Sequence, residues 1–176
     1  MKHLLFALGI LLAALVSGLH AEEKKVSELT VAGLRFKVSE GWTPKAKPRA
    51  MSQGGLTYKT SEVKGLDADF YHFGAGQGGS VEANIARWKG QFEGGAKEVE
   101  TAKLADDKID FLHLQGTFMS GTPFGKKTPL KDHAMLGAII DNGDKGAVFV
   151  KLTGPKEEVA KAVVAFKALI VSAYQK

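Results

Sequence analysis

A glycine-rich segment directly before a helical pattern offers the first candidate chemistry. Residues 74–80 read Gly-Ala-Gly-Gln-Gly-Gly-Ser. Backbone N–H groups at a helix N-terminus lack intrahelical partners and lie at the positive end of the helix dipole, so they can hold an anion. We therefore expect a ligand site on this loop and on the polar face of the helix after it. The predicted site consists of Gly76, Gln77, Gly78, Gly79, Ser80, Asn84 and Arg87.

Two other interpretations of the same loop stay open. Gly74, Gly76 and Gly79 have the G-x-G-x-x-G spacing of dinucleotide-binding turns. That motif belongs to a parallel strand-helix-strand unit, whereas the strands around this loop read as antiparallel, so we expect no nicotinamide or other cofactor. The simpler alternative is a loop that needs glycine for positive φ angles, followed by an ordinary amphipathic helix.

A small hydrolase is the alternative from a different functional class. Its general base would be His72 or His113, paired with a nearby carboxylate such as Asp67 or Asp69. His72 shares a strand face with apolar residues, so a hydrogen-bonded histidine at the edge of the core explains it better. Asp67 and Asp69 point the same way on one strand, which suits a cation or acid–base chemistry but also describes a solvated strand face. We assign no catalytic residue, and the histidines lack the spacing of a zinc site.

Two basic segments favour a third function, adhesion to anionic envelope polymers. Residues 45–49 and residues 126–131 each contain three lysines or arginines. If these predicted loops lie together, they can bind phosphates in a way that weakens with salt; otherwise their charges are simply solvated. The formal net charge is only +5, from 24 Lys and Arg against 19 Asp and Glu. This modest charge argues against a specific nucleic-acid binder.

The N-terminus predicts export. Lys2 precedes an apolar run that extends to Leu19, and Ala21 supplies a small residue for cleavage. The run is shorter than the ~20 residues that span a bilayer. We expect residues 1–21 to be removed as a signal peptide, which leaves no membrane span and places the protein in the periplasm or outside the cell. Residues 22–176 then form a single domain, with no cysteine for a disulfide.

Short strands and two helices are expected to position these residues. The first helix begins at Val81 and ends near Gly94, and the second follows Pro155. Their connections are too short for regular strand-helix alternation, so we predict an α+β fold: a mostly antiparallel sheet covered by helices. Strands are predicted over 28–38 as a hairpin around Gly33, over 56–59, 66–73, 98–104 and 109–119, and over 134–153 as a second hairpin. The apolar stripes are Val81, Ile85, Trp88 and Phe92 in the first helix, and Val159, Val163, Phe166 and Ile170 in the second.

Two stretches resemble a family of exported bacterial proteins without an assigned activity. They are residues 73–88, FGAGQGGSVEANIARW, and residues 149–155, FVKLTGP. The Gly41-Trp42 pair, the late hairpin and the closing helix also resemble the PsbP and Mog1 type of sandwich, as a likeness of fold alone. The resemblance implies export and an α+β sandwich, and it supplies no catalytic residue. The leading prediction is an exported, noncatalytic binding or interaction domain whose partner is an envelope component or a small anionic ligand.

Overall fold

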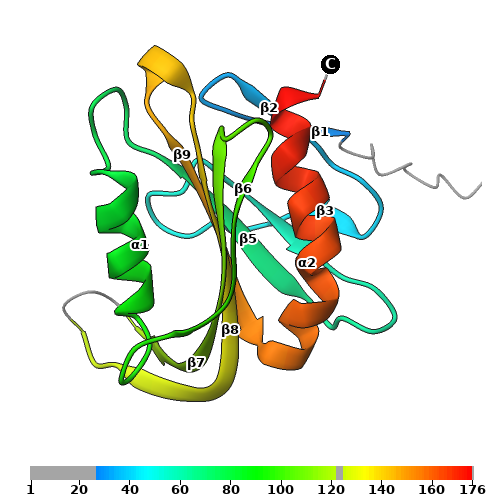
Figure 1. The fold of residues 1–176 in the computed structure, drawn as a ribbon. Coiled ribbons are helices and arrows are strands. Elements are labelled where there is room, and N and C mark those ends of the chain that lie inside the picture. Colours follow the sequence, from blue (N-terminus) through cyan, green and yellow to red (C-terminus); the bar gives the residue numbers. More distant parts are fainter. Residues whose placement is uncertain (1–26, 122–124, 176) are drawn as a thin grey trace, which may run out of the picture.

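A seven-stranded antiparallel sheet separates two helices. The computed structural model describes residues 27–121 and 125–175, so the predicted signal peptide, residues 1–21, lies outside the described residues. Figure 1 shows α1 (Val81–Lys89) and α2 (Lys156–Val171) on opposite sides of the sheet. The predicted fold class, a mostly antiparallel sheet covered by helices, is confirmed.

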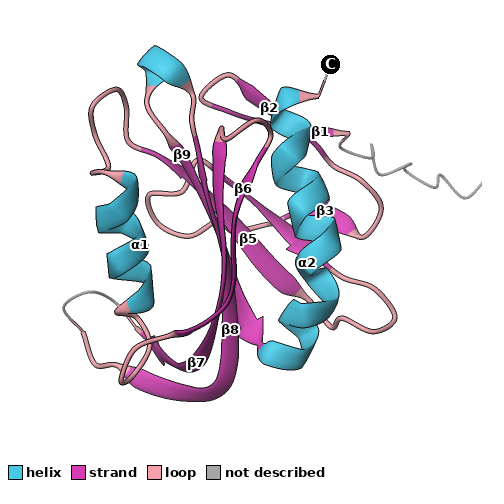
Figure 2. Ribbon diagram, viewed as in Figure 1, coloured by secondary structure: helices cyan, strands magenta, loops and turns pink. Residues whose placement is uncertain are grey.

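The order of strands in the sheet is β3-β4-β5-β9-β8-β7-β6, and each neighbouring pair is antiparallel. Figure 2 shows the strands of this sheet between the two helices. A separate hairpin of β1 (Glu28–Val31) and β2 (Leu34–Lys37) turns at Gly33, as predicted. Short 3-10 turns lie at Gly143–Lys145 and Ser172–Tyr174. The strands of the sheet are β3 (Trp42–Pro44), β4 (Gly54–Tyr58), β5 (Leu66–His72), β6 (Lys97–Leu104), β7 (Ile109–Ser120), β8 (Thr128–Ile140) and β9 (Val148–Pro155).

Two strands differ most from the expectation. Trp42–Pro44 lies outside every predicted strand, but it forms the edge strand β3. Proline is tolerated there because an edge strand has one side on which no N–H donor is needed. Strand β8 begins at Thr128, six residues before the predicted start at Ala134. Its added length reaches past Gly116, where the pairing with β7 shifts register.

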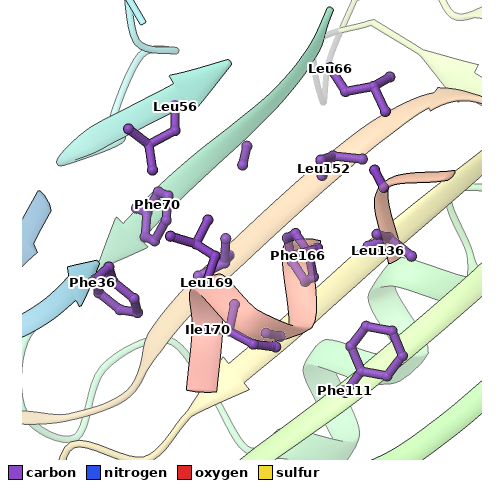
Figure 3. Packing of buried hydrophobic residues seen from close by; sticks show 14 of the residues in the cluster. Phe36, Leu56, Leu66, Phe70, Phe111, Leu136, Leu152, Phe166, Leu169 and Ile170 are labelled. Atoms are coloured by element: carbon purple, nitrogen blue, oxygen red, sulfur yellow. The ribbon is translucent and has the colours of Figure 1, made fainter. Parts of the chain in front are cut away.

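The larger hydrophobic core lies between the sheet and α2 (Figure 3). Helix α2 buries Val159, Phe166 and Ile170 of the predicted stripe, while Val163 is only partly buried. The Phe166 ring lies 6.3 Å from the Phe111 ring of β7, between centroids. The β1–β2 hairpin closes one end of this core with apolar side chains of its own. The 3.6-residue periodicity therefore predicted the buried face of this helix correctly.

A smaller core lies between α1 and the other face of the sheet. Its buried members are Trp88, Phe92, Leu112, Leu114, Phe118, Met135, Ile139 and Phe149. The predicted end of α1 near Gly94 is wrong, because the helix ends at Lys89 and Gly90 donates its N–H to the Ala86 carbonyl. Phe92 leaves the helix and pairs with Phe118 in an isolated β-bridge. It is buried as predicted, but from a different backbone conformation.

Trp88 holds α1 on the sheet by packing against a glycine. A Cβ atom at Gly137 of β8 would lie 2.5 Å from Cζ3 of the indole. We expect Gly137→Ala to lower the free energy of unfolding by about 1–3 kcal/mol, since added volume in a packed core forces side chains and backbone to shift. Urea denaturation measures this loss. Gly90→Ala is the control, because Gly90 has a right-handed helical φ of −68° and its new Cβ would approach no atom closer than 3.4 Å. Equal losses in both variants would contradict the packing argument.

Candidate functional site

A pocket of about 330 Å³ lies between α1, the end of β7 and β9. Four cationic side chains line it: Arg49, Arg87, Lys127 and Lys151. We call it the cationic pocket, since no carboxylate is found among its described lining residues. The remaining lining residues are Gln91, Phe118, Met119, Ser120 and Gly121. Both basic segments of the sequence contribute to it, through Arg49 and Lys127.

Lys151 of β9 is the least solvated charge of this pocket. Its Nζ donates a hydrogen bond of 2.6 Å to Oε1 of Gln91 and lies 5.9 Å from the centre of the Phe118 ring. Burial, together with repulsion from Arg49 and Arg87, lowers the pKa of Lys151 to about 8, although Asp69 acts in the opposite direction. The positive charge of the protonated amine is thus poorly compensated by nearby negative charge. A bound anion would supply the missing negative charge.

Asp69 lies across from Lys151 in the sheet, but its carboxylate is paired with two other cations. In the β5–β9 pairing Asp69 lies opposite Lys151. Its carboxylate oxygens lie 2.9 Å from Lys45 Nζ and 3.2 Å from Arg49 Nε, and Lys45 also lies 3.0 Å from Asp67. Asp69 is only 4% exposed, so the expectation of a solvated acidic face is wrong for this residue. The basic segment folds across β5, and this ion pair brings Arg49 to the pocket.

The predicted glycine loop is held in place by Asn84. This side chain is buried, and its Nδ2 donates hydrogen bonds to the carbonyls of Gly78 at 2.7 Å and Ser80 at 2.8 Å. Its Oδ1 accepts a hydrogen bond from the Arg87 guanidinium. The Ser80 hydroxyl accepts from the N–H of Ala83 at 3.2 Å, so Ser80 is the N-cap of α1. The loop therefore orients Arg87 through Asn84.

The glycines of the loop have conformations that other residues rarely adopt. The φ angles of Gly76, Gly78 and Gly79 are +66°, +94° and +82°. A Cβ at Gly78 would also lie 2.9 Å from Cε2 of Phe149. The positive φ angles and the close packing explain why glycine occupies these positions, which agrees with the simpler of the alternative interpretations of the loop.

Among the seven predicted site residues, Arg87 is the one that lines the cationic pocket. Ser80 and Asn84 bind the backbone around the start of α1, whereas Gly76, Gln77, Gly78 and Gly79 belong to the loop before it. Reasoning from the sequence did not place Lys151 in the site. A signal was present, since Lys151 is a charged residue inside the otherwise apolar stretch of β9 from Val148 to Leu152.

The hydrolase pairing is not assembled. His72 and Phe70 are two residues apart on β5, so both lie on the sheet face toward α2. His113 lies on the same face, since it is two residues from Phe111 in β7. Asp67 and Asp69 occupy the opposite face of β5. The sheet therefore separates both histidines from both aspartates.

The two histidines of the hydrolase hypothesis, His72 and His113, differ in their hydrogen bonding. Nδ1 of His72 lies 3.3 Å from the carbonyl oxygen of Ala147. His113 is 5% exposed, and its Nε2 has no hydrogen-bond partner among the described residues. Burial lowers the pKa of His113, while Glu100, its partner across the β6–β7 pairing, acts in the opposite direction. Glu100 itself is paired with Lys167 of α2.

Within residues 27–121 and 125–175, no three His, Asp or Glu side chains are grouped so that they could hold a metal ion. Neither helix in the described part of the chain has the length and apolar composition that a membrane crossing requires.

Comparison of the chain with protein-family models and with curated proteins gave no match. The family resemblance, the PsbP and Mog1 likeness and the export of the protein stay predictions.

Proposed function

We propose that this protein is an exported, noncatalytic binding domain that holds a small anionic ligand in the cationic pocket. The observation that supports the proposal is the gathering of four cations around a pocket whose described lining contains no carboxylate. Like charges repel one another strongly where water is partly excluded, and a bound anion converts this repulsion into attraction. The volume of about 330 Å³ is sufficient for a small ligand.

Arg87 and Lys151 are the main ligand-binding groups in this proposal. The Arg87 guanidinium is held by Asn84 at one side, and its planar fork can donate two parallel hydrogen bonds to a carboxylate or phosphate. The Lys151 ammonium is held by Gln91, and its other N–H groups can donate to the anion. Arg49 and Lys127 add charge at the edge of the pocket. These residues bind and orient a ligand, and the proposal assigns none of them a catalytic step.

Calorimetric titration of the purified protein with sodium sulfate tests the proposal. We expect saturable binding of one sulfate per chain. Arg87→Gln is expected to weaken it by about ten-fold or more, the usual effect of removing a hydrogen bond to a charged group. Arg35→Gln is the matched control, because Arg35 lies on the separate β1–β2 hairpin. Binding that does not saturate, or an equal loss in both variants, would contradict the proposal.

Adhesion to an anionic envelope polymer is a second candidate. It is favoured by the meeting of the two basic segments, since Arg49 and Lys127 come from different loops and line the same pocket. A polymer would contact lysines outside the pocket as well, and its affinity would fall steeply with salt. Lys126→Gln distinguishes the two candidates, because Lys126 is not among the described lining residues of the pocket. This variant weakens binding of a polyphosphate if a polymer is bound, and leaves sulfate binding unchanged.

A further inference from the structure

A second, smaller pocket of about 170 Å³ adjoins the cationic pocket. The two pockets share Arg87, Gln91 and Lys151. The other lining residues of the smaller pocket are all aromatic: Tyr71, Phe73, Trp88 and Phe149. We call it the aromatic pocket. One ligand can therefore contact aromatic rings at one end and cationic groups at the other.

Residues far apart in the sequence build the aromatic pocket. Tyr71 of β5 pairs with Phe149 of β9 across the sheet. The Phe73 ring is stacked on Tyr71, with centroids 6.5 Å apart and planes at 15°, and its centroid lies 5.8 Å from that of Phe149. Gly78 lets the glycine loop lie close to Phe149, because a Cβ there would lie 2.9 Å from Cε2 of the ring. The glycine loop thus supports the aromatic pocket.

Phe73 is 40% exposed, although its ring lies beside those of Tyr71 and Phe149. Its neighbours Tyr71 and Phe149 hold one side of the ring. A flat ring placed in the pocket would cover part of the remaining surface, in the offset or edge-to-face arrangements that aromatic pairs prefer. A cavity of about 150 Å³ is known to accommodate benzene, so about 170 Å³ accommodates one six-membered ring.

We propose that the ligand is an aromatic anion, whose ring occupies the aromatic pocket and whose carboxylate or phosphate group lies between Arg87 and Lys151. This inference rests on the proposed function, since it assumes that the cationic pocket binds an anion. The inference adds the chemical class of the ligand. An inorganic anion would fill only part of the space that the cationic and aromatic pockets form together. The three shared residues require that the ring and the anionic group be directly connected or separated by a short link.

Calorimetric titrations with three phosphate monoesters test the inference: methyl phosphate, phenyl phosphate and cyclohexyl phosphate. We expect phenyl phosphate to bind about ten-fold more tightly than methyl phosphate, or better, because its ring leaves water. Cyclohexyl phosphate is expected to bind more weakly than phenyl phosphate, since a puckered ring cannot stack. Phe73→Ala is expected to remove the preference for phenyl phosphate while leaving the affinity for methyl phosphate unchanged.

Val164→Ala is the matched control, because Val164 is an exposed apolar residue on α2, across the sheet. It is expected to keep the preference for phenyl phosphate. Equal affinities for phenyl and methyl phosphate would overturn the inference and leave anion binding standing. Equal affinities for phenyl and cyclohexyl phosphate would overturn the requirement for a flat ring. A preference that survives in Phe73→Ala would overturn the placement of the ring. Failure of all three esters to bind would overturn the proposed function as well.

Discussion

Lys151→Met is expected to raise the stability of the protein at pH 7 by about 1–3 kcal/mol. The pKa of Lys151 is lowered to about 8 in the folded state, from an ordinary value of 10.5. Each unit of such a shift corresponds to about 1.4 kcal/mol, and loss of the hydrogen bond to Gln91 reduces the gain. Methionine fills a similar volume without a charge. Urea denaturation of the variant and the wild type measures the difference.

The stabilising effect of Lys151→Met is expected to depend on pH. The unfolded chain binds a proton at Lys151 more tightly than the folded protein does, so the wild type gains stability from this group as pH rises. Below about pH 8, burial of the ammonium group lowers the free energy of unfolding by its full amount. This destabilisation disappears as the pH approaches 10.5, the ordinary pKa of the lysine in the unfolded chain. The Lys151→Met variant lacks this gain in stability with pH. A stability difference that is the same at pH 7 and pH 10 would contradict the assignment of the cost to Lys151.

The same substitution is expected to weaken sulfate binding by about ten-fold or more, because it removes a charged donor from the pocket. Stability and binding would then change in opposite directions, as expected for a residue kept for function rather than for folding. Lys161→Met is the matched control, since Lys161 lies on α2 and pairs with Glu62 at the surface. Unchanged sulfate binding in Lys151→Met would remove Lys151 from the site.

Trp88→Ala is expected to lower the free energy of unfolding by about 3–5 kcal/mol, the usual cost of truncating a buried aromatic residue. Trp88 is 3% exposed and packs directly on Gly137. Since Trp88 precedes Gln91 by three residues and follows Arg87, loosening the helix displaces both pocket residues. Sulfate affinity is therefore expected to fall together with stability. Urea denaturation and calorimetry measure the two effects, and Trp88→Phe provides a milder variant that retains a packed ring.

Phe166→Ala is the control for Trp88→Ala. Phe166 is completely buried on the other face of the sheet, so a similar loss of stability is expected. Its effect on sulfate affinity should be small under conditions where the variant is folded, because α2 contributes no described residue to either pocket. Equal losses of affinity in the two variants would show that binding depends on stability alone.

The first hairpin and the buried face of α2 could be predicted because the pattern that specifies each lies within a short stretch of sequence. The alternation around Gly33 predicted the first hairpin, and the spacing of Val159, Phe166 and Ile170 predicted the buried face of α2. The end of α1 was not predictable from apolar spacing, since Phe92 continues the helical pattern while its backbone has left the helix. Gly90 ends the helix before the Gly94-Gly95 pair that the sequence favours.

The site was only partly predictable because it depends on which strands are neighbours. Arg87 followed from the pattern of α1, but the meeting of Arg87 with Lys151 requires β9 to lie between β5 and β8. The same arrangement pairs Tyr71 with Phe149 and Asp69 with Lys151. Strand register is set by long-range packing, and alternation within one strand carries no information about its partner.

The most direct measurement is the pKa of the Lys151 side chain, followed by NMR with and without sulfate. Sulfate keeps its charge throughout the titration of a lysine, so any change belongs to the protein. A pKa of about 8 is expected for the free protein, with a clear rise at saturating sulfate, because a nearby anion favours the ammonium form. An identical pKa in both conditions would mean that no anion lies beside Lys151, which contradicts anion binding in the cationic pocket.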